Sequence, residues 1–184
     1  MRKLAVIIIC IPVLFSCSRI EISGDEKQLL LSERAFSEYG YSFPDAPQGK
    51  YTKFRLPDGA IEMTYIYKGY AKDSSYLNIS NMITIDKSRI DAEDTYLTKA
   101  KSVNLSKVSN SKLQKIEGFG YGDDSVLYLW LTNDQPVGNY FLFRMNNITY
   151  QLFFQGFYFA DSESWSQFFT HKIEPSVKTL FGKN

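Results

Sequence analysis

With 184 residues, of which 44% are hydrophobic and 16% aromatic, the chain is large and apolar enough to bury one core without a metal or a disulfide. This composition argues against a disordered stalk and favours a folded, β-rich body. The 21 basic and 20 acidic residues nearly cancel, and no basic block occurs, so we expect no nucleic-acid partner.

The first residues carry the pattern of an export signal. Met1-Arg2-Lys3 is basic, residues 4–15 contain no charge, and the small residue Ser16 precedes Cys17. A charged start, an apolar segment and a small residue at the cleavage site are the parts of a secretory signal. The apolar run is too short to span a bilayer, because a transmembrane helix needs about 20 apolar residues. We therefore expect cleavage between Ser16 and Cys17.

The residues at this cleavage site suggest how the protein is held. Leu14-Phe15-Ser16-Cys17 resembles the lipobox of bacterial lipoproteins, with leucine at its start, a small residue before the cysteine and a bulkier Phe15 than usual between them. The resemblance implies that Cys17 carries a diacylglycerol thioether and becomes an acylated (palmitate-bearing) N-terminus, which anchors the protein to a membrane. Each buried CH₂ contributes about 0.8 kcal/mol, so several chains hold firmly. The alternative is an ordinary cleaved signal beside an incidental cysteine.

Two neighbours of the cleavage site add to this interpretation. Ser18 follows the cysteine, at the position where an aspartate in a bacterial lipoprotein would favour the inner membrane. The resemblance therefore implies the outer membrane in preference to the inner one. Cys10 leaves with the signal, and acylation of Cys17 explains the single cysteine that remains.

Three regions are expected along the chain: a signal peptide over residues 1–16, a polar tether over 17–27, and a single domain over 28–184. A helix is predicted from Glu26 to Tyr39, because its apolar residues recur at helical spacing and Gly40 can end it.

Most of the domain is predicted to form an antiparallel sheet. Alternating, β-prone stretches separated by turn residues predict strands over residues 51–56, 61–70, 76–85, 112–121, 125–132, 139–145 and 148–157. Pro57-Asp58-Gly59 and Asn146-Asn147 supply turns between neighbouring strands. The second turn predicts that Phe143 faces Tyr150. It also predicts one apolar face, made of Phe141, Phe143, Met145, Ile148, Tyr150, Leu152 and Phe154.

Two more helices complete the expected fold. One spans residues 91–101, and the other spans 162–173 with an apolar stripe of Trp165, Phe168, Phe169 and Ile173. Glu174-Pro175 interrupts this second helix, and Val177, Leu180 and Phe181 are expected to form a last docked turn. The fold class is therefore α+β: an antiparallel sheet with about three packed helices in a single domain. In shape alone, this order resembles the PsbP/Mog1-like fold, a likeness that carries no functional residues with it.

The sequence contains no evident catalytic or metal-binding set. His171, the only histidine, falls away from the apolar stripe of its helix and is expected to face solvent. The sequence has too few histidines and cysteines to bind zinc or iron. Asp91, Glu93 and Asp94 lack the spacing of a calcium-binding loop, so we interpret these acids as favourable charges at the start of a helix. The glycines of residues 118–122 lack nucleotide-binding spacing and are interpreted as a strand with a bare face. We expect no metal and no cofactor.

Two functional hypotheses follow. In the first, a non-catalytic binding or adaptor domain faces the periplasm. Its aromatic residues Tyr65, Tyr67, Tyr121 and Trp130 would bind an envelope protein, a glycan or a lipid, although most aromatic residues belong to cores. In the second, an envelope hydrolase uses a carboxylate pair drawn from Glu62, Glu117, Asp123 and Asp124, because such pairs have no fixed spacing.

Overall fold

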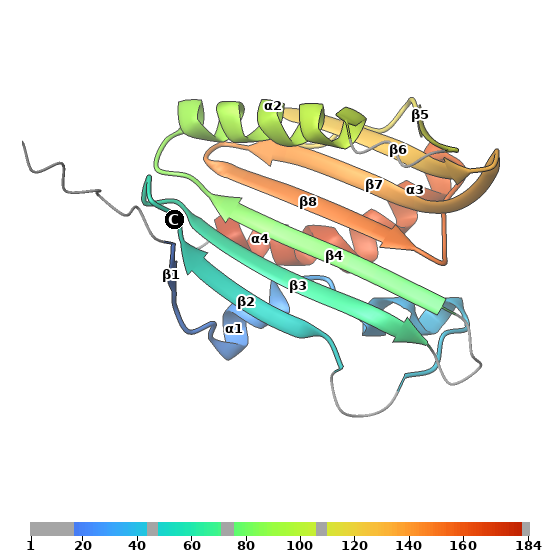
Figure 1. The fold of residues 1–184 in the computed structure, drawn as a ribbon, viewed down its shortest axis with the longest axis horizontal. Coiled ribbons are helices and arrows are strands. Elements are labelled where there is room, and N and C mark those ends of the chain that lie inside the picture. Colours follow the sequence, from blue (N-terminus) through green and yellow to red (C-terminus); the bar gives the residue numbers. More distant parts are fainter. Residues whose placement is uncertain (1–16, 44–47, 71–75, 106–109, 182–184) are drawn as a thin grey trace, which may run out of the picture.

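One antiparallel sheet of eight strands forms the centre of the molecule (Figure 1). The computed structural model describes residues 17–43, 48–70, 76–105 and 110–181. The strands are β1 (Ser18–Arg19), β2 (Lys50–Arg55), β3 (Ile61–Tyr70), β4 (Tyr76–Ile85), β5 (Ser111–Lys115), β6 (Asp124–Thr132), β7 (Gln135–Met145) and β8 (Ile148–Gln155). Their order across the sheet is β1-β2-β3-β4-β8-β7-β6-β5. The predicted α+β class is confirmed.

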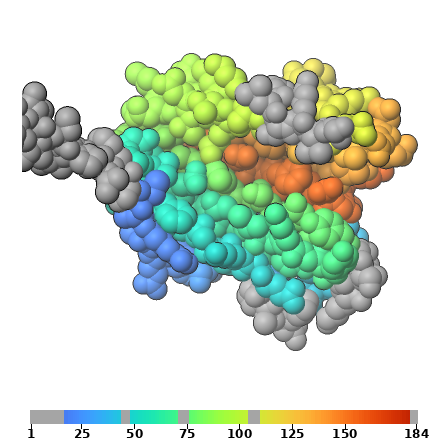
Figure 2. Space-filling view, in the orientation of Figure 1, coloured from blue at the N-terminus to red at the C-terminus, as the bar shows by residue number. Residues whose placement is uncertain are grey.

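Helices cover the two faces of the sheet unequally. On one face lies α2 (Arg89–Leu105), which contacts β7 and β8 (Figure 1). The other face is covered by α1 (Gly24–Gln28), the 3₁₀-helix η1 (Glu33–Tyr39), α3 (Ser162–Phe168), the π-helix η2 (Phe169–Ile173) and α4 (Glu174–Phe181). In Figure 2, β8 is visible between α2 and the β3–β4 hairpin. The long helix therefore leaves part of its face uncovered.

The β7–β8 hairpin has the predicted register. Met145 pairs with Ile148, Phe143 with Tyr150 and Phe141 with Leu152. The predicted apolar face packs against the C-terminal helices, whose stripe is also buried: Trp165, Phe168, Phe169 and Ile173. This dense aromatic layer between sheet and helices is the core of the domain.

The N-terminal segment differs from the prediction. The expected tether contains β1, which pairs with β2, and α1, which begins with a capping box between Ser23 and Glu26. The expected helix over residues 26–39 is divided, because Leu30 and Leu31 are both buried and the backbone N–H of Leu31 donates to Asn81 Oδ1. In a continuous helix the N–H of Leu31 would donate to the carbonyl of Lys27, so its bond to the sheet interrupts the helix at this point.

The glycine-rich segment also differs from the prediction, since β5 ends at Lys115 and residues 118–122 form a loop. Gly118 and Gly122 have φ of 86° and 70°, which a regular strand does not allow. The loop directs Tyr121 onto Phe169, with ring centroids 4.5 Å apart. The glycines therefore break the strand rather than leave one of its faces bare.

The last helix continues through Pro175, where an interruption was predicted, and the expected last turn is part of α4, with Val177 buried. The N–H of Glu174 donates to the carbonyl of Phe169, five residues earlier, in the π-helical turn of η2. Pro175 then occupies the first turn of α4, where a missing N–H costs little. Among the described residues, no helix is both long and apolar enough to cross a membrane.

Candidate functional site

The predicted lipid attachment point lies at one end of the sheet. Cys17 is exposed and stands immediately before β1, whose Ser18 pairs with Arg55 of β2. Ser16 and the rest of the predicted signal lie outside the described residues. The thiol is thus sterically open to modification, at the end of the sheet where the β2–β3 turn also lies.

The four aromatic residues expected to bind a partner do not form one surface. Tyr65 and Tyr67 are 0% and 2% exposed in the core, and the Tyr65 hydroxyl donates to the buried Glu33 carboxylate. Tyr121 packs on the C-terminal helix, whereas Trp130 lies on the opposite face of the sheet, 5.0 Å from the ring of Phe153. The four residues therefore share no binding surface: Tyr65 and Tyr67 are core residues, and alternation along β6 places Trp130 on the opposite face.

Three of the four candidate carboxylates serve other roles. Asp123 and Asp124 both accept hydrogen bonds from Arg144, which is 5% exposed beneath α2. Glu117 forms an exposed ion pair with Lys115, at 2.9 Å. Glu62, the fourth, lines a pocket.

The remaining polar candidates form no site. His171 is exposed as predicted, and its Nδ1 lies 2.7 Å from the carbonyl oxygen of Gln167. Ser88 caps the start of α2: its hydroxyl accepts from the N–H of Asp91 and donates to the Asp91 carboxylate. Within the described ranges, no three His, Cys, Asp or Glu side chains are grouped closely enough to hold a metal ion.

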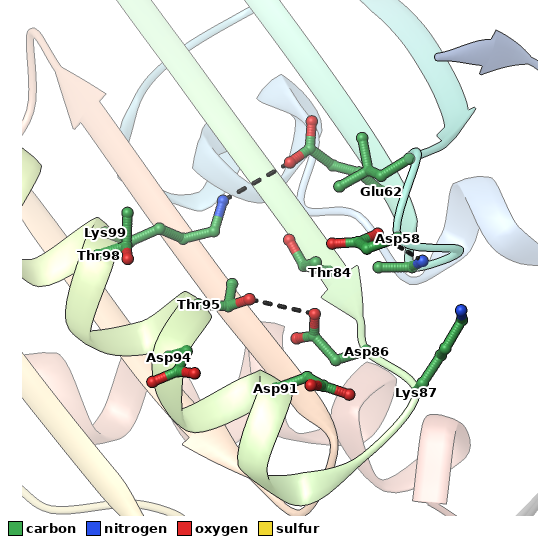
Figure 3. Close-up of a pocket in the computed structure, with 12 residues that line it drawn as sticks. Asp58, Glu62, Thr84, Asp86, Lys87, Asp91, Asp94, Thr95, Thr98 and Lys99 are labelled. Atoms are coloured by element: carbon green, nitrogen blue, oxygen red, sulfur yellow. Dashed lines mark hydrogen bonds and ion pairs between the residues drawn. The ribbon is translucent and has the colours of Figure 1, made fainter. Parts of the chain in front are cut away.

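A polar pocket of about 580 Å³ lies between the first half of α2 and the end of the β3–β4 pair (Figure 3). The turn over residues 57–59 closes it on a third side, held by a hydrogen bond from the N–H of Gly59 to the carbonyl of Leu56. We call this cavity the α2 pocket. Its lining residues are Leu56, Asp58, Ala60, Glu62, Thr84, Asp86, Lys87, Asp91, Asp94, Thr95, Thr98 and Lys99.

Asp86 is the most constrained acid in the α2 pocket. Its backbone N–H donates to the carbonyl of Asn147, and its carbonyl accepts from Asn147 Nδ2, so the β7–β8 turn fixes it just beyond the end of β4. Its side chain lines the pocket, where Oδ1 accepts from the hydroxyl of Thr95 at 3.1 Å. The residue is 5% exposed, and burial raises the pKa of its carboxyl group.

Two buried acceptors in this pocket have no partner. Asp86 Oδ2 and Thr84 Oγ1 make no hydrogen bond to any described residue, although Thr84 is only 1% exposed. Thr84 pairs with Glu62 across the β3–β4 ladder, so both side chains project on the side of α2. Buried polar atoms are satisfied in the large majority of cases, and each exception calls for an explanation.

A lysine and a glutamate occupy the inner part of the same pocket. Lys99 Nζ lies 3.6 Å from Glu62 Oε2 and 2.8 Å from Met82 Sδ. Burial lowers the pKa of Lys99, and the nearby Glu62 carboxylate opposes that shift. The pair neutralises itself, which leaves the other acids to set the charge of the pocket.

The α2 pocket as a whole is acidic. Five acidic side chains line it, against Lys87 and Lys99. Asp58 and Asp91 are partly engaged, by the N–H of Ala60 and by the Ser88 hydroxyl. The arrangement attracts a cation and offers it acceptors that the fold leaves unused.

Sequence reasoning missed Asp86, the central residue of this pocket. The strand pattern ended at Ile85, and nothing in the spacing distinguished the next residue from a loop aspartate. The available signal was slight: Thr84 and Asp86 alternate with Ile85, and such alternation places two polar side chains on the same face.

Comparisons with protein-family models, with curated proteins and with solved structures found no match to this chain.

Proposed function

We propose that this chain is an envelope lipoprotein, anchored through acyl chains on Cys17, whose α+β domain binds a ligand or partner without catalysing a reaction. The lipobox resemblance supports the anchor, favours the outer membrane and implies a domain facing the periplasm. The exposure of Cys17 is compatible with acylation.

The observation that carries the binding role is the pair of unpartnered, buried acceptors in the α2 pocket. An unsatisfied buried acceptor costs about 1–3 kcal/mol, which a chain selected for stability alone would remove with an apolar residue. Asp86 and Thr84 each carry one such atom, and both residues line the α2 pocket. A bound ligand that supplies donors would recover this cost.

Native mass spectrometry of the full chain, purified from membranes in mild detergent, tests the binding role. We expect a bound ligand or partner on the wild type and its loss from Asp86→Asn. Glu163→Gln removes an exposed charge from α3 on the other side of the sheet and should retain it. Repeated recovery of the protein with nothing bound would count against the proposal.

Metabolic labelling with a palmitate analogue tests the anchor separately. The wild type should incorporate the label and fractionate with membranes, and Cys17→Ala should do neither. An unmodified thiol on the processed wild type would contradict the lipoprotein assignment and leave the pocket unaffected.

A carboxylate-dependent envelope hydrolase is the second candidate, because Glu62 and Asp86 line the same pocket. The raised pKa of Asp86 suits a general acid, whereas the ion pair of Glu62 with Lys99 limits its use as a base. Hydrolysis of an envelope glycan by the wild type, abolished in both Glu62→Gln and Asp86→Asn, would favour this candidate over the first.

A further inference from the structure

The groups that lack partners in the α2 pocket define what its ligand must offer. An ionised carboxylate oxygen such as Asp86 Oδ2 only accepts hydrogen bonds, and the Thr84 hydroxyl, from the same pocket, is also unpartnered. A ligand rich in acceptors would leave the carboxylate unsatisfied. The pocket therefore needs a hydrogen-bond donor.

The charge of the pocket specifies the donor further. Lys99 is committed to Glu62, and Lys87 extends over the turn at Gly59, at the rim in Figure 3. Neither lysine supplies a donor to Asp86 Oδ2. Asp86 feels the charge of Lys99 but forms no ion pair with it. Such a buried carboxylate favours a positively charged donor, because charge-assisted hydrogen bonds are about twice as strong as neutral ones.

An organic cation fits better than a metal ion. The described residues provide no group of three acidic, histidine or cysteine ligands for a metal. The pocket already accommodates one ammonium group, that of Lys99, against a carboxylate and a methionine sulfur. These contacts show the chemistry by which an ammonium group is held in this pocket.

The position of the pocket relates it to the predicted anchor. Ser18, next to Cys17, pairs with Arg55, and Asp58 of the pocket lies three residues further along the chain. The α2 pocket and Cys17 therefore lie at the same end of the sheet. A lipid headgroup with a primary amine and a free amine both have access to a pocket placed in this way.

We propose that the α2 pocket binds a primary alkylammonium group, which donates hydrogen bonds to Asp86 Oδ2 and Thr84 Oγ1. The inference rests on the proposed function, in which this pocket is the ligand site, and it adds the chemical class of the ligand.

Calorimetric titration of the full acylated chain in nanodiscs of phosphatidylcholine tests the inference. Ethanolamine is the probe, choline is a control of equal charge without N–H donors, and ethylene glycol is a neutral control. We expect ethanolamine to bind, and choline and ethylene glycol to bind at least about tenfold more weakly, as expected for loss of a charged hydrogen bond. Asp86→Asn should weaken ethanolamine binding by about the same factor, and Glu163→Gln should leave it unchanged.

The outcomes separate the ligand class from the proposed function. Equal binding of ethanolamine and choline, or no binding of ethanolamine, overturns the inference. A different ligand on the wild type in native mass spectrometry, lost with Asp86→Asn, would then leave the proposed function standing. Absence of both would overturn the two together.

A second set of nanodiscs, containing phosphatidylethanolamine, identifies the source of the amine. If the lipid headgroup fills the pocket, added ethanolamine should show no further binding there. If free amines are the ligand, binding should be the same in both kinds of nanodisc. Either result supports an ammonium ligand.

Discussion

Two polar clusters lie on the α2 side of the sheet, and they are built in opposite ways. In the first, all three nitrogens of the Arg144 guanidinium donate to Asp123 or Asp124, at 2.5–3.0 Å. In the second, Asp86 Oδ2 and Thr84 Oγ1 have no donor among the described residues. Arg144 and Asp86 are equally buried, at 5% exposed each.

If the α2 pocket binds a ligand as proposed, this difference separates a polar group that stabilises the fold from one that binds the ligand. A fully paired buried charge fixes the geometry of its neighbours and has no free hydrogen-bonding group for a ligand. An unpaired buried acceptor destabilises the free protein and gains its partner only on binding. Substitutions in the two clusters should therefore change stability in opposite directions.

Arg144→Met should produce the largest effect. It removes the donor shared by Asp123 and Asp124 and leaves these carboxylates close together beneath α2. We expect the free energy of unfolding to fall by about 2–3 kcal/mol, near the lower end for breaking a buried ion pair because both acids are partly exposed. Urea denaturation measures this loss. A change below about 0.5 kcal/mol would show that the cluster does not support the fold.

Asp86→Asn should stabilise the protein at neutral pH by about 1 kcal/mol, because the substitution removes an unpaired buried charge. The gain should depend on pH. Since the folded-state pKa of Asp86 is raised above 3.8, its ionisation destabilises the fold as pH rises through that raised value. Asp58 and Asp91 reinforce the shift, and Lys99 opposes it.

Urea midpoints of wild type and Asp86→Asn at several pH values test this prediction. The difference between them should be close to zero below pH 3.8, where the wild-type carboxyl is neutral in both states, and reach its full size above the folded-state pKa. A difference that does not vary with pH, or a destabilised variant, would mean that Asp86 stabilises the free fold.

Thr84→Val and Thr149→Val form a matched pair with the smallest expected effects. Thr84 Oγ1 has no partner, whereas Thr149 Oγ1 donates to the carbonyl of Ala92 at 3.3 Å. Both residues are buried in neighbouring strands on the α2 side. We expect a gain of about 0.5–1 kcal/mol for Thr84→Val and a loss of similar size for Thr149→Val. The same sign for both would remove the distinction between the two clusters.

The sheet could be predicted because its information is local. Alternation and the Asn146-Asn147 turn fix the register of the last hairpin, since a slip of one residue would expose Phe143 and Tyr150. The buried stripe of the last helix follows from its spacing in the same way. Where a distant contact decides the backbone, as the Leu31–Asn81 bond does, periodicity gave the wrong element.

The α2 pocket could not be predicted, because contacts between residues distant in the sequence form it. Its acids come from the turn after β2, from β3, from the end of β4 and from α2, and only the packing of α2 brings them together. Glu62 was among the candidate carboxylates, but its neighbours in the sequence gave no sign of Asp86. The distinguishing property of Asp86, a missing donor at full burial, exists only in three dimensions.

The short strand β1 has a mechanical consequence. Ser18 and Arg19 pair with β2 directly after Cys17. A lipid on that cysteine would therefore be joined to the folded domain without a flexible linker. Such a mounting would restrict tilt and rotation and keep the domain against the bilayer surface. A flexible segment after Cys17 would let the domain move freely around its anchor. Attachment through β1 would instead keep the Cys17 end of the sheet at a nearly constant distance from the membrane.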